Sequence, residues 1–291
     1  MKCLFLGYFW RVAQALQEAE NAELAGVGLE LNRTRSLEAK EFCESSGQPW
    51  FSAENIRNNA AFHAIIEQGI DLIVVGAFGQ ILPEAILRAP SIGIINVHPS
   101  FLPAYRGNCP IEYQILNGEP EGGVTLHWMT QGVDAGPIIS QKKIPIDEND
   151  DYDAIFMRAH HTAARLMAEL LKKSPHAWAR VPQTEDSLPL PSLQKKEGLI
   201  NWGLPAENLL RFVRANGWKK WVRTEFADGD ALVITKARIP SEQSEPDVSP
   251  GTVVSVAPHP IIRTGKGNME LLEFSGKKLN VGEVLPSTGK R

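Results

Sequence analysis

The stretch Ile94-Ile95-Asn96-Val97-His98-Pro99-Ser100-Phe101-Leu102-Pro103-Ala104-Tyr105-Arg106-Gly107 combines the end of a buried strand with a turn-rich loop. Residues two apart in a strand point to the same face, so Asn96 and His98 project together with roughly 7 Å between their backbones. An amide donor beside a proton carrier suits a reaction in which an oxyanion forms while a proton moves. Alternatively, Asn96 only forms hydrogen bonds with the backbone of the loop, and His98 is only a hydrogen-bonded residue at the strand end. These two residues by themselves leave both interpretations open.

The segments before this stretch alternate between strand and helix patterns. Strands are predicted at residues 2–6, 24–31 and 71–75, with helices between them. The last of these runs is continuously apolar, as in a strand that is covered on both faces. The alternation predicts an α/β fold with a Rossmann-like, mostly parallel sheet. Ligands of such sheets bind outside the carboxyl ends of the strands, which is where Asn96 and His98 are expected.

The composition of the chain changes after the first 180 residues. We assign residues 1–180 to a catalytic domain and residues 181–204, where prolines accumulate among polar residues, to a linker. Residues 205–291 contain short strand patterns separated by glycine, proline and aspartate turns. This second part is predicted to be a small β-barrel of the OB type.

The overall composition is that of an ordinary globular protein, with 43% hydrophobic and 22% charged residues. The formal charge of −4 provides no general attraction for nucleic acid or an anionic membrane, although a local basic patch is compatible with it. The three cysteines are widely spaced and suggest neither a disulfide framework nor a metal motif. With neither a signal peptide nor a membrane-length apolar run, we expect a cytoplasmic protein that makes no membrane contact.

Two motifs resemble the signature of formyltransferases that use 10-formyltetrahydrofolate. They are Asn96-Val97-His98-Pro99-Ser100-Phe101-Leu102-Pro103 with Arg106-Gly107, and Gly132-Val133-Asp134-Ala135-Gly136-Pro137-Ile138. Residues 76–83 are similar to the folate loop of this family. Residues 200–239 are similar to the C-terminal portion of methionyl-tRNA formyltransferases and of the formyltransferase domain that modifies UDP-linked aminoarabinose. The resemblance implies an N-formyltransferase that uses 10-formyltetrahydrofolate as co-substrate and requires no metal.

The resemblance also assigns the catalytic residues Asn96, His98 and Asp134. Asn96 would donate to the oxyanion of the tetrahedral intermediate, a contribution of about 3 kcal/mol per donor. His98 would accept the amine proton or pass it to the departing folate nitrogen. Asp134 would hold the histidine, stabilise its charged form or relay protons through water. By itself, Asp134 before Ala135-Gly136 is better explained as a turn residue, and the catalytic role is favoured only in combination with Asn96 and His98.

Further residues are expected around this triad. The resemblance implies cofactor contacts from Phe78, Gly79, Gln80, Ile81, Leu82, Val133 and Asp134. Arg106 with Gly107 either binds a phosphate or carboxylate of the substrate or braces its own loop. His127 and Trp128 are interpreted as core residues of a strand.

The formyl acceptor is predicted to be a primary amine on a small molecule, most simply an amino sugar carried on a nucleotide. The first turn reads Gly7-Tyr8-Phe9-Trp10 and the interval 31–56 is compact, whereas methionyl-tRNA formyltransferases typically have a Gly-Thr-Pro-type turn and a longer basic loop. Aromatic rings at the end of the first strand suit a nucleobase or sugar. The expected substrate contacts are Tyr8, Trp10, Tyr105, Arg106 and Gly107.

Methionyl-tRNA is the alternative acceptor, for which a group of basic residues between Arg211 and Arg223 provides the argument. Further alternatives are a formyltetrahydrofolate hydrolase, formylation of another small amine such as hydroxyornithine, and a noncatalytic folate-binding protein. The sequence predicts no particular oligomeric state.

Overall fold

The computed structural model describes residues 1–33, 35–184, 188–242 and 246–287, which form two compact units. The first unit contains residues 1–110, 121–145 and 156–190, and the second contains residues 111–120, 146–155 and those from 191 onwards. The division at Pro191 falls inside the predicted linker. Residues 185–187 of that linker, and residues 243–245 and 288–291 of the predicted C-terminal domain, lie outside the described residues.

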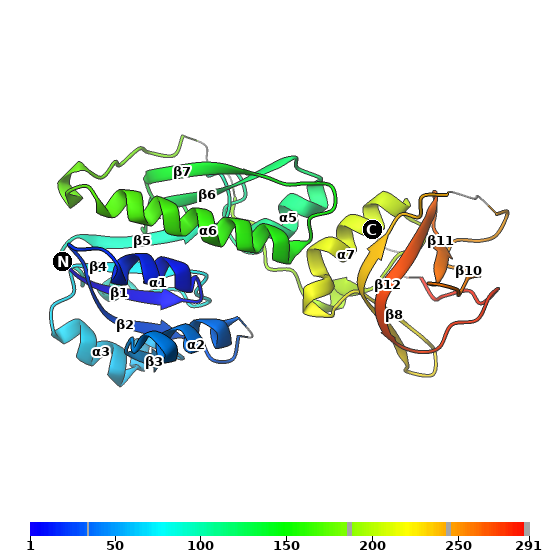
Figure 1. Cartoon of the computed structure of the whole chain (residues 1–291), viewed down its shortest axis with the longest axis horizontal. Coiled ribbons are helices and arrows are strands. Elements are labelled where there is room, and N and C mark those ends of the chain that lie inside the picture. Colours follow the sequence, from blue (N-terminus) through cyan, green and yellow to red (C-terminus); the bar gives the residue numbers. More distant parts are fainter. Residues whose placement is uncertain (34, 185–187, 243–245, 288–291) are drawn as a thin grey trace. The chain divides into compact units, whose positions relative to one another are not determined.

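A seven-stranded sheet organises the first unit (Figure 1). Its strands are β1 (Lys2–Gly7), β2 (Glu23–Leu29), β3 (Trp50–Ser52), β4 (Leu72–Gly76), β5 (Gly93–His98), β6 (Glu121–Trp128) and β7 (Ile138–Pro145). The order is β3-β2-β1-β4-β5-β6-β7, and every pairing is parallel except those that β6 makes with β5 and β7. Every residue of β4 is buried, as its continuous apolar run predicts. The Rossmann-like, mostly parallel sheet is confirmed.

Helices pack on both faces of this sheet. They are α1 (Trp10–Gln17), α2 (Ser36–Ser46), α3 (Ala60–Glu67), α4 (Glu84–Leu87) and α6 (Tyr152–Leu171), with short 3-10 turns at Ile56–Asn58 and Pro175–Ala177. Helix α5 (Pro110–Asn117) belongs to the second unit, apart from its first residue. Helices α1 and α6 lie side by side (Figure 1). They are joined by a hydrogen bond from the backbone N–H of Arg11 to Nε2 of His160, at 3.0 Å. Phe62 of α3 and Ile86 of α4 share one buried cluster with Leu4 of β1.

The second unit contains α7 (Ala206–Asn216) and a five-stranded antiparallel sheet. The strands are β8 (Arg223–Glu225), β9 (Ala231–Arg238), β10 (Val253–Ser255), β11 (Ile261–Arg263) and β12 (Asn268–Gly276), with 3-10 turns at Lys195–Gly198 and Gly217–Lys219. The fully buried Trp202 packs with Leu209 and Val213 of α7 in the core of this unit. The order β10-β11-β12-β9-β8 confirms a separate small antiparallel domain but leaves two edges, so barrel closure stays a prediction.

The three cysteines are free thiols in the described structure. Burial raises the pKa of Cys3 to about 12 and that of Cys43 to about 11, so both remain protonated at neutral pH. Among the described residues, no helix combines the length and apolar character needed to cross a membrane.

Candidate active site

The end of β5 presents Asn96 and His98, and the neighbouring strand β6 adds a third polar side chain. The antiparallel pairing places Asn96 directly opposite His127 and His98 directly opposite Thr125. Residues that face each other across an antiparallel pair lie on the same side of the sheet. His127 therefore belongs to the group formed by Asn96 and His98. Its side chain is nearly inaccessible, as expected, but it contacts polar groups rather than only the apolar core.

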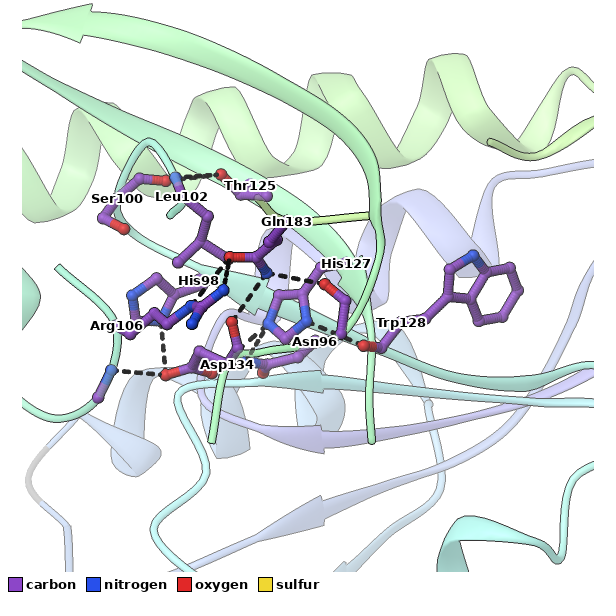
Figure 2. A network of polar contacts seen from close by, with 12 residues as sticks. Asn96, His98, Ser100, Leu102, Arg106, Thr125, His127, Trp128, Asp134 and Gln183 are labelled. Atoms are coloured by element: carbon purple, nitrogen blue, oxygen red, sulfur yellow. Dashed lines mark hydrogen bonds and ion pairs between the residues drawn. The ribbon is translucent and has the colours of Figure 1, made fainter. Parts of the chain in front are cut away.

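The loop between β6 and β7 brings Asp134 to these residues (Figure 2). Oδ1 of Asp134 accepts from Nδ2 of Asn96 at 3.0 Å, and Oδ2 accepts from the backbone N–H of Gly107 at 2.9 Å. Asp134 has φ 48° and Tyr105 has φ 61°, in the left-handed region that costs a non-glycine residue about 1–3 kcal/mol. The contacts of the two loops must offset this cost. The structure thus brings together the three residues predicted as a triad.

Two histidines lie on either side of the Asp134 carboxylate (Figure 2). Nδ1 of His98 is 3.4 Å from Oδ2, and Nε2 of His127 is 3.5 Å from Oδ1. The other ring nitrogens face backbone carbonyls: Nε2 of His98 is 2.8 Å from the oxygen of Tyr105, and Nδ1 of His127 is 3.0 Å from that of Trp128. Because a carbonyl oxygen only accepts, each of these nitrogens carries a hydrogen.

The charges in this site follow from burial and from these contacts. Burial lowers the pKa of His98 below its usual 6.5, against the opposing influence of Asp134 and of the Tyr105 carbonyl. Burial alone would raise the pKa of Asp134, but His98, His127 and the Gly107 N–H together hold it well below its usual value. At neutral pH the site therefore contains an ionised carboxylate and a His98 ring that is able to accept a proton.

Gln183 ties this loop to Arg106, a contact that the sequence did not predict. Its Nε2 donates to the carbonyl oxygens of Asp134 at 2.9 Å and Gly136 at 2.7 Å. Its Oε1 accepts from Nε and Nη2 of Arg106 at 3.0 and 2.8 Å. Arg106 is only 6% exposed. Of the two interpretations considered for Arg106, the structure shows the brace within the loops.

Gly107 has a structural reason to be a glycine. Its φ is 95°, and a Cβ atom built at this position would lie 2.6 Å from the backbone nitrogen and oxygen of Leu190. Only a residue without a side chain fits this close approach, which also directs the Gly107 N–H toward Asp134.

Glu30 shapes the predicted cofactor loop, residues 76–83. Its Oε2 accepts from the backbone N–H of Gly79 at 2.6 Å, and its Oε1 accepts from Nε2 of Gln80 at 3.2 Å. The side chain of Leu82 is buried in the core, whereas Ile81 is 77% exposed. The remaining predicted cofactor residues differ in the same way: Phe78 is partly buried against the core, and Val133 is 48% exposed. Ile81 and Val133 are thus the predicted apolar contacts that remain accessible.

The aromatic residues after β1 lie against helices. The ring of Trp10 stacks on Phe42 at a centroid distance of 5.2 Å and meets the edge of His160 at 5.6 Å. Trp10 also lines a shallow depression of about 620 Å³ between α1 and α2. Tyr8 packs near Phe9 and Phe156, at 6.3 and 6.0 Å. Among the described residues, these ring contacts of Trp10 include none with the triad, and the roles of Tyr8 and Trp10 as substrate contacts stay predictions.

Comparison with known proteins identifies the family. Residues 15–171 match the sequence profile described as formyl transferase, and residues 192–287 match the one described as formyl transferase, C-terminal domain. The chain belongs to the formyltransferase family. This match confirms the predicted enzyme class, a formyltransferase of a folate-dependent family. Among the described residues, no cluster of three or more histidine, cysteine, aspartate or glutamate residues is arranged to hold a metal ion.

The formyltransferase is similar to enzymes whose names indicate different substrates. The methionyl-tRNA formyltransferase of Caldanaerobacter subterraneus subsp. tengcongensis is 34% identical, with 84% of this chain and 81% of that chain covered. The N-formyltransferase from Helicobacter canadensis, solved with folinic acid and dTDP-3-aminofucose, has a TM-score of 0.66 at 17% identity and coverages of 93% and 98%. HypX from Aquifex aeolicus, solved with tetrahydrofolic acid, has a TM-score of 0.65 at 20% identity and coverages of 96% and 44%. The two solved structures support the fold alone.

Proposed function

We propose that this formyltransferase acts on methionyl-tRNA. The observation that supports this acceptor is the name shared by relatives of 33–37% identity, which are methionyl-tRNA formyltransferases. Most of them align with more than four-fifths of this chain. Methionyl-tRNA, the alternative acceptor in the sequence analysis, therefore replaces the nucleotide-linked amino sugar as the favoured one.

The amino sugar remains the second candidate because the compact interval 31–56 is a property of this chain itself. One ring expected to stack on a nucleobase, that of Trp10, already stacks on Phe42. A direct comparison of the two acceptors is therefore the first experiment.

The basic residues near α7 do not by themselves support a tRNA surface. Nζ of Lys219 lies 2.6 Å from a carboxylate oxygen of Glu112, and both side chains are largely buried. Arg214 donates to the carbonyl oxygens of Asp147 and Asp150 at 3.0 and 2.6 Å. Since these cations are engaged within the second unit, the tRNA proposal rests on the relatives.

The triad supports the following chemistry. A neutral amine attacks the formyl carbon of 10-formyltetrahydrofolate, forming a C–N bond and a tetrahedral oxyanion that receives a hydrogen bond from Asn96. His98 accepts the proton that the amine loses, and Asp134 stabilises the resulting imidazolium. The C–N bond to the folate then breaks, and the proton passes to the departing nitrogen. The products are the formamide and tetrahydrofolate.

Donor binding is assigned to the loops on either side of this triad. Backbone groups of residues 78–82 would contact the pterin ring, in an arrangement maintained by Glu30. The exposed side chains of Ile81 and Val133 would supply apolar contact. We assign Leu82 to support of this loop because its side chain is buried in the core.

The acceptor is tested by supplying purified enzyme and 10-formyltetrahydrofolate with methionyl initiator tRNA or with dTDP- and UDP-linked amino sugars. Formation of the formylated product and of tetrahydrofolate are measured together. We expect formyl-methionyl-tRNA, with an apparent affinity that falls steeply as salt rises. Turnover of an amino sugar alone would reject the tRNA proposal. Release of formate without any amine would indicate the hydrolase alternative.

Two broader expectations accompany this proposal. We infer an OB-type arrangement for the second unit from its five short antiparallel strands. We also expect a cytoplasmic enzyme, from the few, widely spaced cysteines and from the tRNA acceptor.

A further inference from the structure

The side-chain amide of Asn96 has no hydrogen left for an oxyanion in the described structure. Its Nδ2 lies 3.0 Å from Oδ1 of Asp134 and 3.1 Å from Nε2 of His127. An NH₂ group has two hydrogens, and these two acceptors use both. Turning the amide over would place its oxygen against the Asp134 carboxylate, so the orientation is fixed by charge. The proposed oxyanion donor must therefore be released by one of its two partners.

His127 is the partner that can change from acceptor to donor. Its Nδ1 carries a hydrogen because it faces the Trp128 carbonyl at 3.0 Å. In the neutral ring, Nε2 then has only a lone pair, which accepts one hydrogen of Asn96. With a proton on Nε2, the same nitrogen donates to Oδ1 of Asp134, 3.5 Å away, and no longer accepts from Asn96. One amide hydrogen of Asn96 becomes available.

We propose that His127 is a positioning residue whose Nε2 proton releases an amide hydrogen of Asn96 for the oxyanion. This role rests on the formyl-transfer chemistry proposed above but not on the identity of the acceptor. His127 acts through Asn96 and Asp134 and needs no contact with the substrate. Its carbonyl partner on β6 fixes the ring, because Nδ1 remains a donor in both states.

The charged and titratable groups around His127 are Asp134, His98 and Arg106. The Asp134 carboxylate faces Nε2 of His127 directly, at 3.5 Å. His98 is the second ionisable ring nearby, with a centroid distance of 6.5 Å. Burial chiefly, and a positive His127 to a smaller extent, lower the pKa of His98, which suits a ring that must accept a proton. Arg106 is connected to the same loop through Gln183, which contacts the Asp134 backbone rather than its carboxylate.

The first test compares the pH dependence of kcat in the wild type and in His127→Gln. Glutamine fills a similar space, forms hydrogen bonds and does not titrate. Relative to His127→Gln, we expect kcat of the wild type to fall by about a hundredfold to a thousandfold as pH rises and Nε2 of His127 loses its proton, the size of one oxyanion donor. The ratio of the two activities cancels the ionisation of the amine substrate. A ratio that stays constant across the whole pH range in which the enzyme remains folded would overturn the proposal.

The exposed His176 provides the matched control. In His176→Gln the ratio to wild type should be constant at every pH. The KM for the folate donor should change little in His127→Gln, because His127 acts on the oxyanion rather than on donor binding.

The second test needs no acceptor and no turnover. In ¹⁵N-labelled wild-type protein, the His127 ring signals are identified by their absence in His127→Gln. We expect Nδ1 to stay protonated throughout, and the Asn96 side-chain NH₂ signals to shift over the same pH range in which Nε2 gains its proton. Protonation of Nε2 with no change at Asn96 would contradict the coupling. Failure of tRNA formylation would leave this result unaffected, so the two proposals are separable.

Discussion

Asn96 and His127 lie directly opposite each other on the antiparallel strands β5 and β6, with Nδ2 of Asn96 3.1 Å from Nε2 of His127. The pair connects the predicted oxyanion donor to a histidine that the sequence analysis assigned to the core. Because Asp134 bridges His98 and His127, the two imidazoles and the amide form one polar network. A change in any member of this network should alter the others.

Asn96→Ala should lose turnover without losing donor affinity. The amide contributes about 3 kcal/mol to an oxyanion that exists only in the transition state, so we expect kcat to fall by at least about a hundredfold. The Kd for a nonreactive folate, measured by calorimetry, should change less than about threefold, far below that loss. Asn58→Ala, at an exposed position, is the control. A parallel loss of folate binding would assign Asn96 to the binding site instead.

Asp134→Asn should lower the pKa of His98 further. The pKa of His98 already lies below 6.5 because of burial, and the Asp134 carboxylate opposes that effect. Replacing the carboxylate by an amide removes the opposition, so the neutral ring persists to lower pH. Asparagine tolerates the left-handed backbone at φ 48°, which limits other damage. The measurement is an NMR titration of the His98 ring proton, and an upward shift would refute the electrostatic assignment.

Gln183→Ala should reduce turnover by about tenfold or more. The substitution removes the hydrogen-bond partner of the buried Arg106 and of two carbonyl groups, and each loss costs about 1 kcal/mol or more. Gln183→Glu should be intermediate, since a carboxylate accepts from Arg106 but cannot donate to the carbonyls of Asp134 and Gly136. Hydrogen exchange of residues 129–137 reports the expected loosening of the loop. The exposed Gln131, replaced by alanine, is the control in the same loop. Unchanged exchange in Gln183→Ala would show that the brace is dispensable.

Glu30→Ala should raise the KM for 10-formyltetrahydrofolate while kcat at saturating donor stays close to wild type. The substitution removes the acceptor for Gly79 N–H and for Gln80 Nε2 and so releases the predicted cofactor loop. Loss of these contacts corresponds to about 1–3 kcal/mol, or roughly fivefold to a hundredfold in KM. Glu54→Ala, at an exposed position, should have no such effect. A loss of kcat at constant KM would place Glu30 in the chemistry instead.

Much of the fold was predictable because it depends on local patterns. The apolar run of β4 required burial on both faces, and alternating strands and helices required a parallel sheet. The period of two in a strand placed Asn96 and His98 on one face. The same alternation in β6 places Thr125 and His127 on one face of the strand and Val124 and Leu126 on the other. The face on which His127 lies could therefore have been predicted from the sequence.

Other features depended on which distant segments meet. The assignment of His127 requires the register of β5 against β6, and the brace requires Gln183 to reach Arg106 from 77 residues away. Trp10 was expected near the substrate because it follows a strand end, and its packing against Phe42 of α2 and His160 of α6 likewise depends on distant segments.

The sequence by itself determined the sheet, the formyltransferase motifs and the face on which Asn96 and His98 lie, because side-chain direction follows from position along a strand. The tertiary structure decided that Asp134 sits between two histidines and that both hydrogens of the Asn96 amide are already used. Hydrogen-bond partners are selected by strand register and loop closure between residues far apart in the chain, and no local pattern specifies them.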